Sequence, residues 1–162
     1  MALDPQIEYV LGLVEKAGFP EFCDLGPEAA RELFEATAPK LDIRPENVFR
    51  VEDRFIPGLP DPIPLRIYTP REPAAGEQLP ILVYLHGGGF VVGSLDSYDS
   101  LCRALANRAD CIVVSVDYRL APEHKFPAAV EDCVEALNWV AENAGEFDGD
   151  AARIAIAGDS AG

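Results

Sequence analysis

The stretch Arg153-Ile154-Ala155-Ile156-Ala157-Gly158-Asp159-Ser160-Ala161-Gly162 joins an apolar run to a Gly-x-Ser-x-Gly motif. The run at 154–157 is typical of a strand that is buried on both faces. A glycine-flanked serine directly after such a strand indicates a nucleophile elbow, a sharp turn that holds the serine hydroxyl exposed. Small flanking residues are needed because the backbone passes close to its neighbours in this turn. We therefore predict that Ser160 is a catalytic nucleophile, the alternative being an ordinary loop serine.

A second glycine-rich segment, His86-Gly87-Gly88-Gly89-Phe90, follows the apolar run at 79–85. Backbone N–H groups in such a loop can bind the negative oxygen that forms when a hydroxyl attacks a carbonyl carbon. We predict an oxyanion hole made by the N–H groups of Gly87, Gly88 and Ala161. The alternative is that the three glycines form only a flexible turn.

A serine nucleophile also needs a base and a carboxylate that orients the base. After an elbow of this type the carboxylate and the histidine come later in the chain, but Gly162 is the last residue here. Both histidines, His86 and His124, precede the serine. We expect His86 to fix the glycine loop by hydrogen bonding, His124 to face solvent, and Asp159 to point away from Ser160. The sequence thus predicts the N-terminal portion of a hydrolase, without its base and acid.

The first third of the sequence changes pattern twice. Residues 1–40 predict two short amphipathic helices, one ending near Gly18 and one running from Pro27 to Pro39. This helical segment either packs on a core or forms part of a lid over a pocket. Apolar residues then alternate with polar ones over 48–69, which predicts an antiparallel pair of strands at a sheet edge.

Continuous apolar runs at 81–85, 111–116 and 154–157 alternate with helical stripes over 98–109 and 130–141. Strands and helices in this order form a parallel sheet covered by helices on both faces. The sequence therefore predicts an α/β fold with a mostly parallel sheet. Residues 41–162 would form a partial α/β domain, with the strand ending at Ala157 at a sheet edge.

Composition excludes several classes of function. With 162 residues and 49% hydrophobic content, the chain can form one domain with a substantial core. A net charge of −15 argues against binding to nucleic acid or to an anionic membrane surface. We find neither an 18-residue apolar stretch nor a secretion signal, which favours a cytoplasmic protein without a membrane span. The four cysteines contain no Cys-x-x-Cys pair and are expected to be core thiols, not disulfides or metal ligands.

Three sequence blocks together resemble the hormone-sensitive-lipase-like family of α/β-hydrolases: His86 to Phe90, the segment 117–129 with Asp-Tyr-Arg-Leu-Ala-Pro-Glu, and Gly158 to Gly162. The resemblance implies an α/β-hydrolase fold, of which this chain is the N-terminal half, and helices at 1–40 that belong to a cap. It also implies hydrolysis of small carboxylic esters through an acyl-serine intermediate, without a cofactor. The triad acid and histidine would lie in a second half of similar length. Tyr98 departs from the family, in which histidine is frequent at this position.

Two other functions are compatible with these residues. One is a small-molecule receptor that keeps the pocket but does not turn over its ligand. The other is an incomplete product with no function of its own. Neither the natural substrate nor the oligomeric state can be inferred from this sequence.

Overall fold

Five strands form one mixed sheet in the computed structural model, which describes residues 3–18, 20, 22–58 and 60–162. The strands lie in the order β1-β2-β4-β3-β5. Their bounds are β1 Arg50–Ile56, β2 Ile63–Thr69, β3 Leu79–Leu85, β4 Ile112–Val116 and β5 Gly149–Gly158. β1 pairs with β2 and β2 with β4 in antiparallel register, whereas β3 is parallel to both β4 and β5. The α/β prediction is confirmed, as is the antiparallel pair at the sheet edge, but the sheet is mixed and not mostly parallel, because β2 is antiparallel to β4 as well as to β1.

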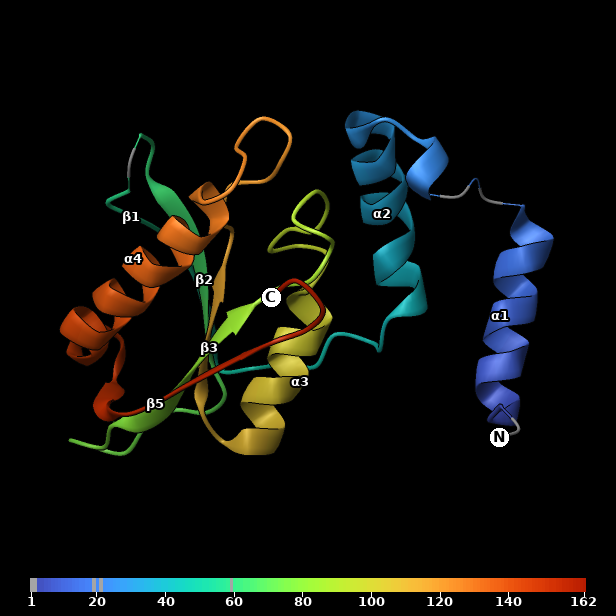
Figure 1. Cartoon of the computed structure of the whole chain (residues 1–162). Helices are drawn as coiled ribbons and strands as arrows, with labels where there is room; N and C mark the ends of the chain where they lie inside the picture. The colour runs from blue at the N-terminus through green and yellow to red at the C-terminus, as the bar shows by residue number, and fades with distance from the viewer. Residues whose placement is uncertain (1–2, 19, 21, 59) are drawn as a thin grey trace.

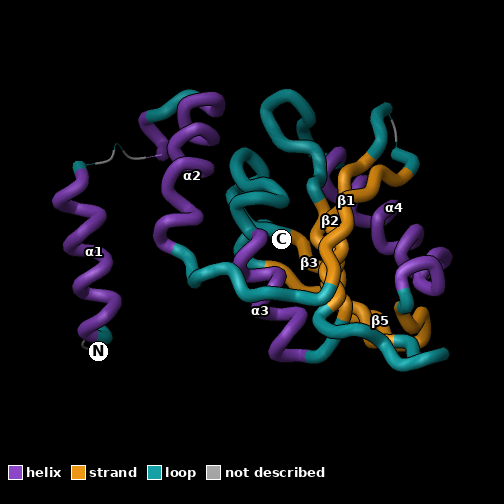
Figure 2. The backbone as a smooth tube through the Cα atoms, turned by 180° about the vertical axis from the view of Figure 1, so that it is seen from behind, coloured by secondary structure: helices purple, strands orange, loops and turns teal. Residues whose placement is uncertain are grey.

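Helices cover the two faces of this sheet. Figure 2 shows α3 (Asp99–Ala109) and α4 (Ala128–Asn143) on opposite sides of the strands. α4 and the short 3₁₀ helix η2 (Ala144–Phe147) pack on the larger core cluster, and α3 packs on the smaller one. Strand β4 contributes to both clusters, because Val114 faces α4 while Val113 faces α3. This alternation along a fully buried strand explains why its sequence is apolar at every position except Ser115.

The N-terminal segment contains α1 (Pro5–Ala17), the 3₁₀ helix η1 (Phe22–Asp24) and α2 (Pro27–Leu41). α1 ends where the sequence predicted, since Gly18 adopts a φ of 64° and its N–H bonds to Glu15. The prediction for α2 was wrong at its end: Pro39 lies inside the last turn and the helix continues to Leu41. α1 buries none of its residues and stands apart from the sheet, whereas α2 lies closer to it (Figure 1).

Three cysteines are free thiols: Cys102 and Cys111 are buried and Cys133 is half-buried. Burial raises the pKa of Cys102 to about 12 and that of Cys133 to about 11, so both thiols stay protonated near neutral pH. The side chain of Cys23 lies outside the described part of the chain. Over the described ranges, no helix is long and apolar enough to cross a membrane. In the same ranges, no cluster of three or more His, Cys, Asp or Glu side chains could hold a metal ion.

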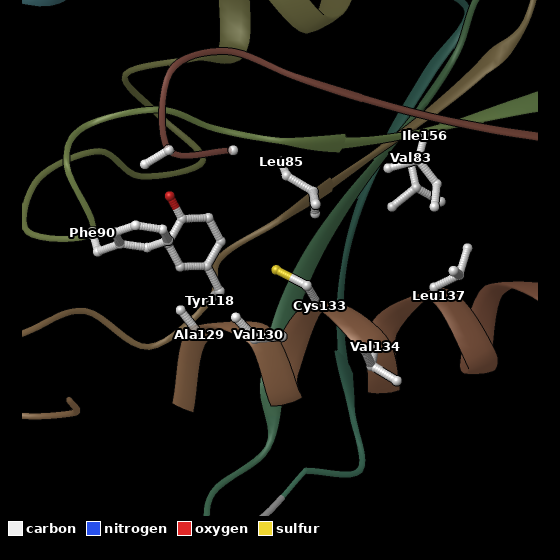
Figure 3. Close-up of a pocket in the computed structure, with 12 residues that line it drawn as sticks. Val83, Leu85, Phe90, Tyr118, Ala129, Val130, Cys133, Val134, Leu137 and Ile156 are labelled. Atoms are coloured by element: carbon white, nitrogen blue, oxygen red, sulfur yellow. The ribbon is translucent and has the colours of Figure 1, made fainter. Parts of the chain in front are cut away.

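β5 lies at the sheet edge, as expected, because β3 is its one partner among the described strands. Next to it, a cavity of about 250 Å³ opens between β5 and α4. Figure 3 shows Ile156 above this cavity and Cys133, Val134 and Leu137 projecting from α4 below it. Ile156 is 55% exposed and Val134 is 51% exposed. α4 therefore carries a second apolar face in addition to the one that packs on the sheet.

This apolar surface beside an open strand edge is expected to make the chain self-associate despite its charge. Replacing both Val130 and Val134 by glutamate should increase the fraction of monomer, measured by size-exclusion chromatography with light scattering. Asn138→Glu is the matched control, because it adds a charge to an exposed position of the same helix. Equal monomer fractions in the double variant and the control would contradict the assignment of this surface.

Candidate active site

The glycine-flanked turn after β5 has the strained geometry of a nucleophile elbow. Ser160 adopts a φ of 52°, in the left-handed region that residues with a β-carbon rarely occupy. A β-carbon at Gly158 would lie 2.6 Å from the carbonyl oxygen of Leu85 at the end of β3. Glycine is therefore required where the turn passes this close to β3. The Gly162 N–H closes the turn on the Asp159 carbonyl at 2.8 Å. The elbow therefore leaves Ser160 at an exposed tip.

The glycine loop is held by hydrogen bonds to its carbonyl groups. The His86 carbonyl accepts from the Tyr118 hydroxyl, and the Gly87 carbonyl accepts from His86 Nδ1 at 2.8 Å. The Gly88 carbonyl accepts from the N–H groups of Val91 and Val92, both at 3.0 Å. Since the N–H of a trans peptide points opposite to its carbonyl, these bonds fix the directions of the Gly87, Gly88 and Gly89 N–H groups.

The N–H of Gly87 is not available to a substrate. It donates to the Asp159 carboxylate at 2.9 Å, so the prediction that this group is an oxyanion donor is at odds with the structure. Within the described residues, no hydrogen bond engages the N–H groups of Gly88 or Gly89. The bond pattern therefore shifts the candidate donors by one residue, to Gly88 and Gly89. Sequence reasoning missed this because three adjacent glycines give no sign of which N–H is already bonded.

His86 is a structural residue of the loop, as expected from the sequence. Its ring is fully buried and stacks on Tyr118 with centroids 4.2 Å apart. Nδ1 must carry the proton, because a carbonyl such as that of Gly87 can only accept. Burial lowers the pKa of His86, which keeps the ring neutral. Its Nε2 has no hydrogen-bond partner in the described part of the chain, so the ring makes no contact of that kind with Ser160.

Asp159 connects the elbow to the glycine loop, a role that the sequence did not indicate. In addition to the Gly87 N–H, its carboxylate accepts from Tyr84 at 2.8 Å and from Tyr98 at 3.1 Å. The hydroxyl of Tyr98, where the family frequently has histidine, is thus bound to the residue that precedes the nucleophile. A carboxylate with three donors fixes the elbow relative to the loop.

The segment 117–124 is partly buried and is bound to α4 by polar contacts. Asp132 on α4 is 2% exposed and accepts from the Arg119 backbone N–H at 2.9 Å and from its guanidinium at 2.7 Å. Asp117 begins the same segment, and its burial together with the nearby carboxylate of Glu35 raises the pKa of Asp117 to about 6. The segment therefore holds the ring of Tyr118 against the ring of His86.

Two apolar cavities flank the glycine loop and share Gly89 in their walls. One, of about 540 Å³, lies between the loop and the N-terminal segment; the other, of about 340 Å³, lies between the loop and residues 121–130. Phe34 lines the first cavity and Phe126 the second. His124 also lines the second cavity, where it is half-buried.

Comparisons with known proteins agree with this geometry. A family model described as alpha/beta hydrolase fold matches residues 82–162. The chain is 47% identical over 161 residues to the esterase LipI of Mycobacterium tuberculosis, which covers 99% of this chain and 48% of LipI. It is 50% identical over 139 residues to the carboxylesterase NlhH of the same organism, covering 85% of this chain and 42% of NlhH.

Solved structures give the same result. A hyperthermophilic esterase from the archaeon Pyrobaculum calidifontis superposes with a TM-score of 0.90 at 46% identity, over 100% of this chain and 51% of that one. An ester hydrolase from the metagenome of Lake Arreo superposes with a TM-score of 0.93 at 41% identity, over 99% of this chain and 52% of that one. The chain thus spans about half the length of the relatives that it matches.

Proposed function

Because this chain belongs to the alpha/beta hydrolase fold family, we propose that it is the nucleophile-bearing half of a serine carboxylesterase for small acyl esters. One observation carries the proposal: among the described residues, the N–H groups of Gly88 and Gly89 make no hydrogen bond, and bonds to the carbonyl groups of the same peptides fix their directions. The loop that contains them is bound to the strained elbow of Ser160 through Asp159. Fixed donors and an exposed hydroxyl are what acyl transfer requires.

In the proposed reaction the Ser160 hydroxyl oxygen attacks the ester carbonyl, and its proton passes to a base. The carbonyl oxygen becomes an oxyanion that accepts hydrogen bonds from the N–H groups of Gly88, Gly89 and Ala161. Collapse of the tetrahedral intermediate expels the alcohol, which takes the proton from the base and leaves an acyl-serine. Water then attacks the acyl-serine, with proton transfers to and from the same base, and releases the acid.

The base and its carboxylate are proposed to come from the other half of the complete enzyme. His86 is a poor base because burial lowers the pKa of its ring, and because its free Nε2 makes no hydrogen bond to Ser160 within the described residues. The two cavities that meet at Gly89 would accept the acyl and the alcohol groups, and their apolar walls suit small uncharged esters. No cofactor has a role in this chemistry, and we propose a cytoplasmic location for the enzyme.

The proposal is tested with a chimera that joins residues 1–162 to the part of LipI following its matched region. The chimera is expected to hydrolyse a short-chain p-nitrophenyl ester about 10⁴–10⁶-fold faster than its Ser160→Ala variant. The 162-residue chain alone should be no faster than its own Ser160→Ala variant, because it lacks the base.

Three outcomes would count against parts of this proposal. Binding of the ester by the chimera without turnover would favour the receptor. No binding and no turnover by a folded chimera would favour an inactive product. Turnover by the isolated chain that depends on Ser160 would mean that His86 or His124 acts as the base.

A further inference from the structure

One face of α2 contacts the segment that follows the glycine loop. Arg31, Phe34 and Glu35 have the i, i+3, i+4 spacing that places side chains on the same side of a helix. Arg31 Nε donates to the Val91 carbonyl at 2.8 Å, and Arg31 Nη2 donates to the Ala121 carbonyl at 2.8 Å. The same guanidinium also pairs with the Glu123 carboxylate at 2.6 Å.

The two carbonyl groups bound by Arg31 belong to residues that hold the glycine loop in place. The Val91 N–H donates to the Gly88 carbonyl and so fixes the direction of the Gly89 N–H. The Ala121 N–H donates to the Phe90 carbonyl at 2.8 Å. Both the carbonyl and the N–H of the peptide between Phe90 and Val91 are therefore hydrogen-bonded. By binding the carbonyl groups of Val91 and Ala121, Arg31 keeps these two residues at a fixed separation.

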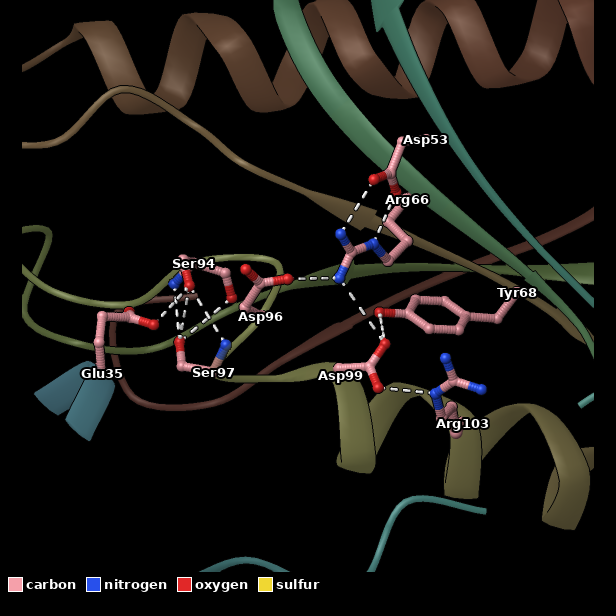
Figure 4. Close-up of polar contacts among 9 residues, drawn as sticks. All are labelled: Glu35, Asp53, Arg66, Tyr68, Ser94, Asp96, Ser97, Asp99 and Arg103. Carbon is pink, nitrogen blue, oxygen red and sulfur yellow. Dashed lines mark hydrogen bonds and ion pairs between the residues drawn. The ribbon is translucent and has the colours of Figure 1, made fainter. Parts of the chain in front are cut away.

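A second set of contacts from α2 supports the same segment. Ser94 Oγ donates to the Glu35 carboxylate at 3.0 Å (Figure 4). The ring of Phe34 stacks on Tyr98 with centroids 6.4 Å apart, and the Tyr98 hydroxyl donates to Asp159. α2 thus contacts both the segment after the glycine loop and Tyr98, one of the donors to the carboxylate that ties the loop to the elbow.

The far end of this segment has further anchors besides its contacts with α2. Arg66 on β2 binds Asp53 at 2.6 Å and Asp96 at 2.7 Å, and Arg103 binds Asp99 at 2.6 Å (Figure 4). The Arg66 pair connects Asp96 to the sheet, and the Arg103 pair stabilises the first turn of α3. Loss of the Arg31 contacts is therefore expected to loosen residues 88–93 and to leave residues 96–103 unchanged.

We propose that Arg31 is a positioning residue for the oxyanion hole, so that the N-terminal segment sets the geometry of the Gly88 and Gly89 N–H groups and does more than cover a pocket. The inference rests on the proposed function for its catalytic consequence. A planar guanidinium can bind two carbonyl groups and a carboxylate at once, whereas the ammonium of lysine cannot reproduce this fork. Glu123 is 53% exposed, so its ion pair contributes less than the two carbonyl contacts.

The first test uses the 162-residue chain and needs no activity. Amide hydrogen exchange, followed by mass spectrometry, is expected to be roughly five- to tenfold faster in peptides covering 88–93 of Arg31→Ala than in wild type. Peptides covering 96–103 serve as the internal control. Glu32→Ala, at an exposed neighbouring position of α2, is the matched control and should behave as wild type. Unchanged exchange at 88–93 in Arg31→Ala would overturn the inference.

The second test uses the chimera with LipI. Arg31→Ala should lower kcat per titrated serine by about tenfold, less than the loss of a whole oxyanion donor, while KM changes less than twofold. Arg31→Lys should show most of the same loss, and added guanidinium should restore part of the activity of Arg31→Ala. A rise in KM with unchanged kcat would assign Arg31 to the pocket instead.

The two tests separate the inference from the function. Faster exchange at 88–93 together with an inactive wild-type chimera would reject the esterase proposal but keep the role of Arg31 in fixing the loop. An active wild-type chimera with unaltered exchange and kcat in Arg31→Ala would reject the role of Arg31 and keep the esterase.

Discussion

A chimera that carries Gly88→Val is expected to show a kcat per titrated serine about 10²–10³-fold below that of the unmodified chimera, with a much smaller change in KM. Gly88 has a φ of 120°, and an added β-carbon would collide with the Val92 carbonyl. Relief of that collision must move the Gly88 carbonyl and, with it, the Gly89 N–H on the same peptide. The oxyanion exists only after attack, so substrate binding is comparatively spared. Titration with an organophosphate, run to completion, gives the number of active serines.

Gly76→Val is the matched control for this substitution. Gly76 also has a positive φ, of 78°, but nothing lies near the position of its β-carbon. The control therefore introduces similar backbone strain in a loop between β2 and β3, away from the elbow. If the glycine loop were only a flexible turn, both variants would lose stability and keep a normal kcat per titrated serine.

Asp132→Ala is expected to destabilise the chimera by about 3 kcal/mol, at the lower end of the range for a broken buried ion pair. The reason is that Asp132 is 2% exposed, whereas the Arg119 side chain that it binds keeps 18% exposure and some contact with water. Loss of the carboxylate also leaves the Arg119 backbone N–H without its acceptor. Urea unfolding of the chimera and of the variant measures the difference in the free energy of unfolding.

The neighbouring residue provides the control for this prediction. Glu131 is 62% exposed and lies 3.7 Å from the same guanidinium, a separation typical of a weak surface ion pair. Glu131→Ala should change the free energy of unfolding by about 0.5 kcal/mol or less. Equal losses in the two variants would mean that the segment 117–124 does not depend on the buried pair.

The strands and the elbow could be predicted from sequence because local chemistry determines them. The run 112–116 is apolar at four of its five positions because both faces of β4 are covered, and the small residues around Ser160 are required by the turn itself. The choice among Gly87, Gly88 and Gly89 could not be made in this way. It depends on a hydrogen bond to Asp159, a contact between residues 72 positions apart.

Long-range polar contacts also explain why Arg31 was missed. In the sequence it is one charged residue on an amphipathic helix, where a solvated position is the usual expectation. Its partners, the carbonyl groups of Val91 and Ala121, are main-chain atoms that leave no trace in residue type. Periodicity also does not tell which surface an apolar helix residue contacts, and Val130 and Val134 on α4 are about half exposed.

The oxygen-binding groups proposed here are main-chain atoms of Gly88 and Gly89, whereas the cavity walls around them are side chains such as Phe34, Phe126 and His124. Mutations that exchange wall residues alter which esters fit without deleting a donor. In the proposed esterase, substrate preference is therefore expected to change more readily than the rate-enhancing atoms. A directed-evolution library should accordingly vary the walls, keep the three glycines, and leave Asp159 and Arg31 unchanged.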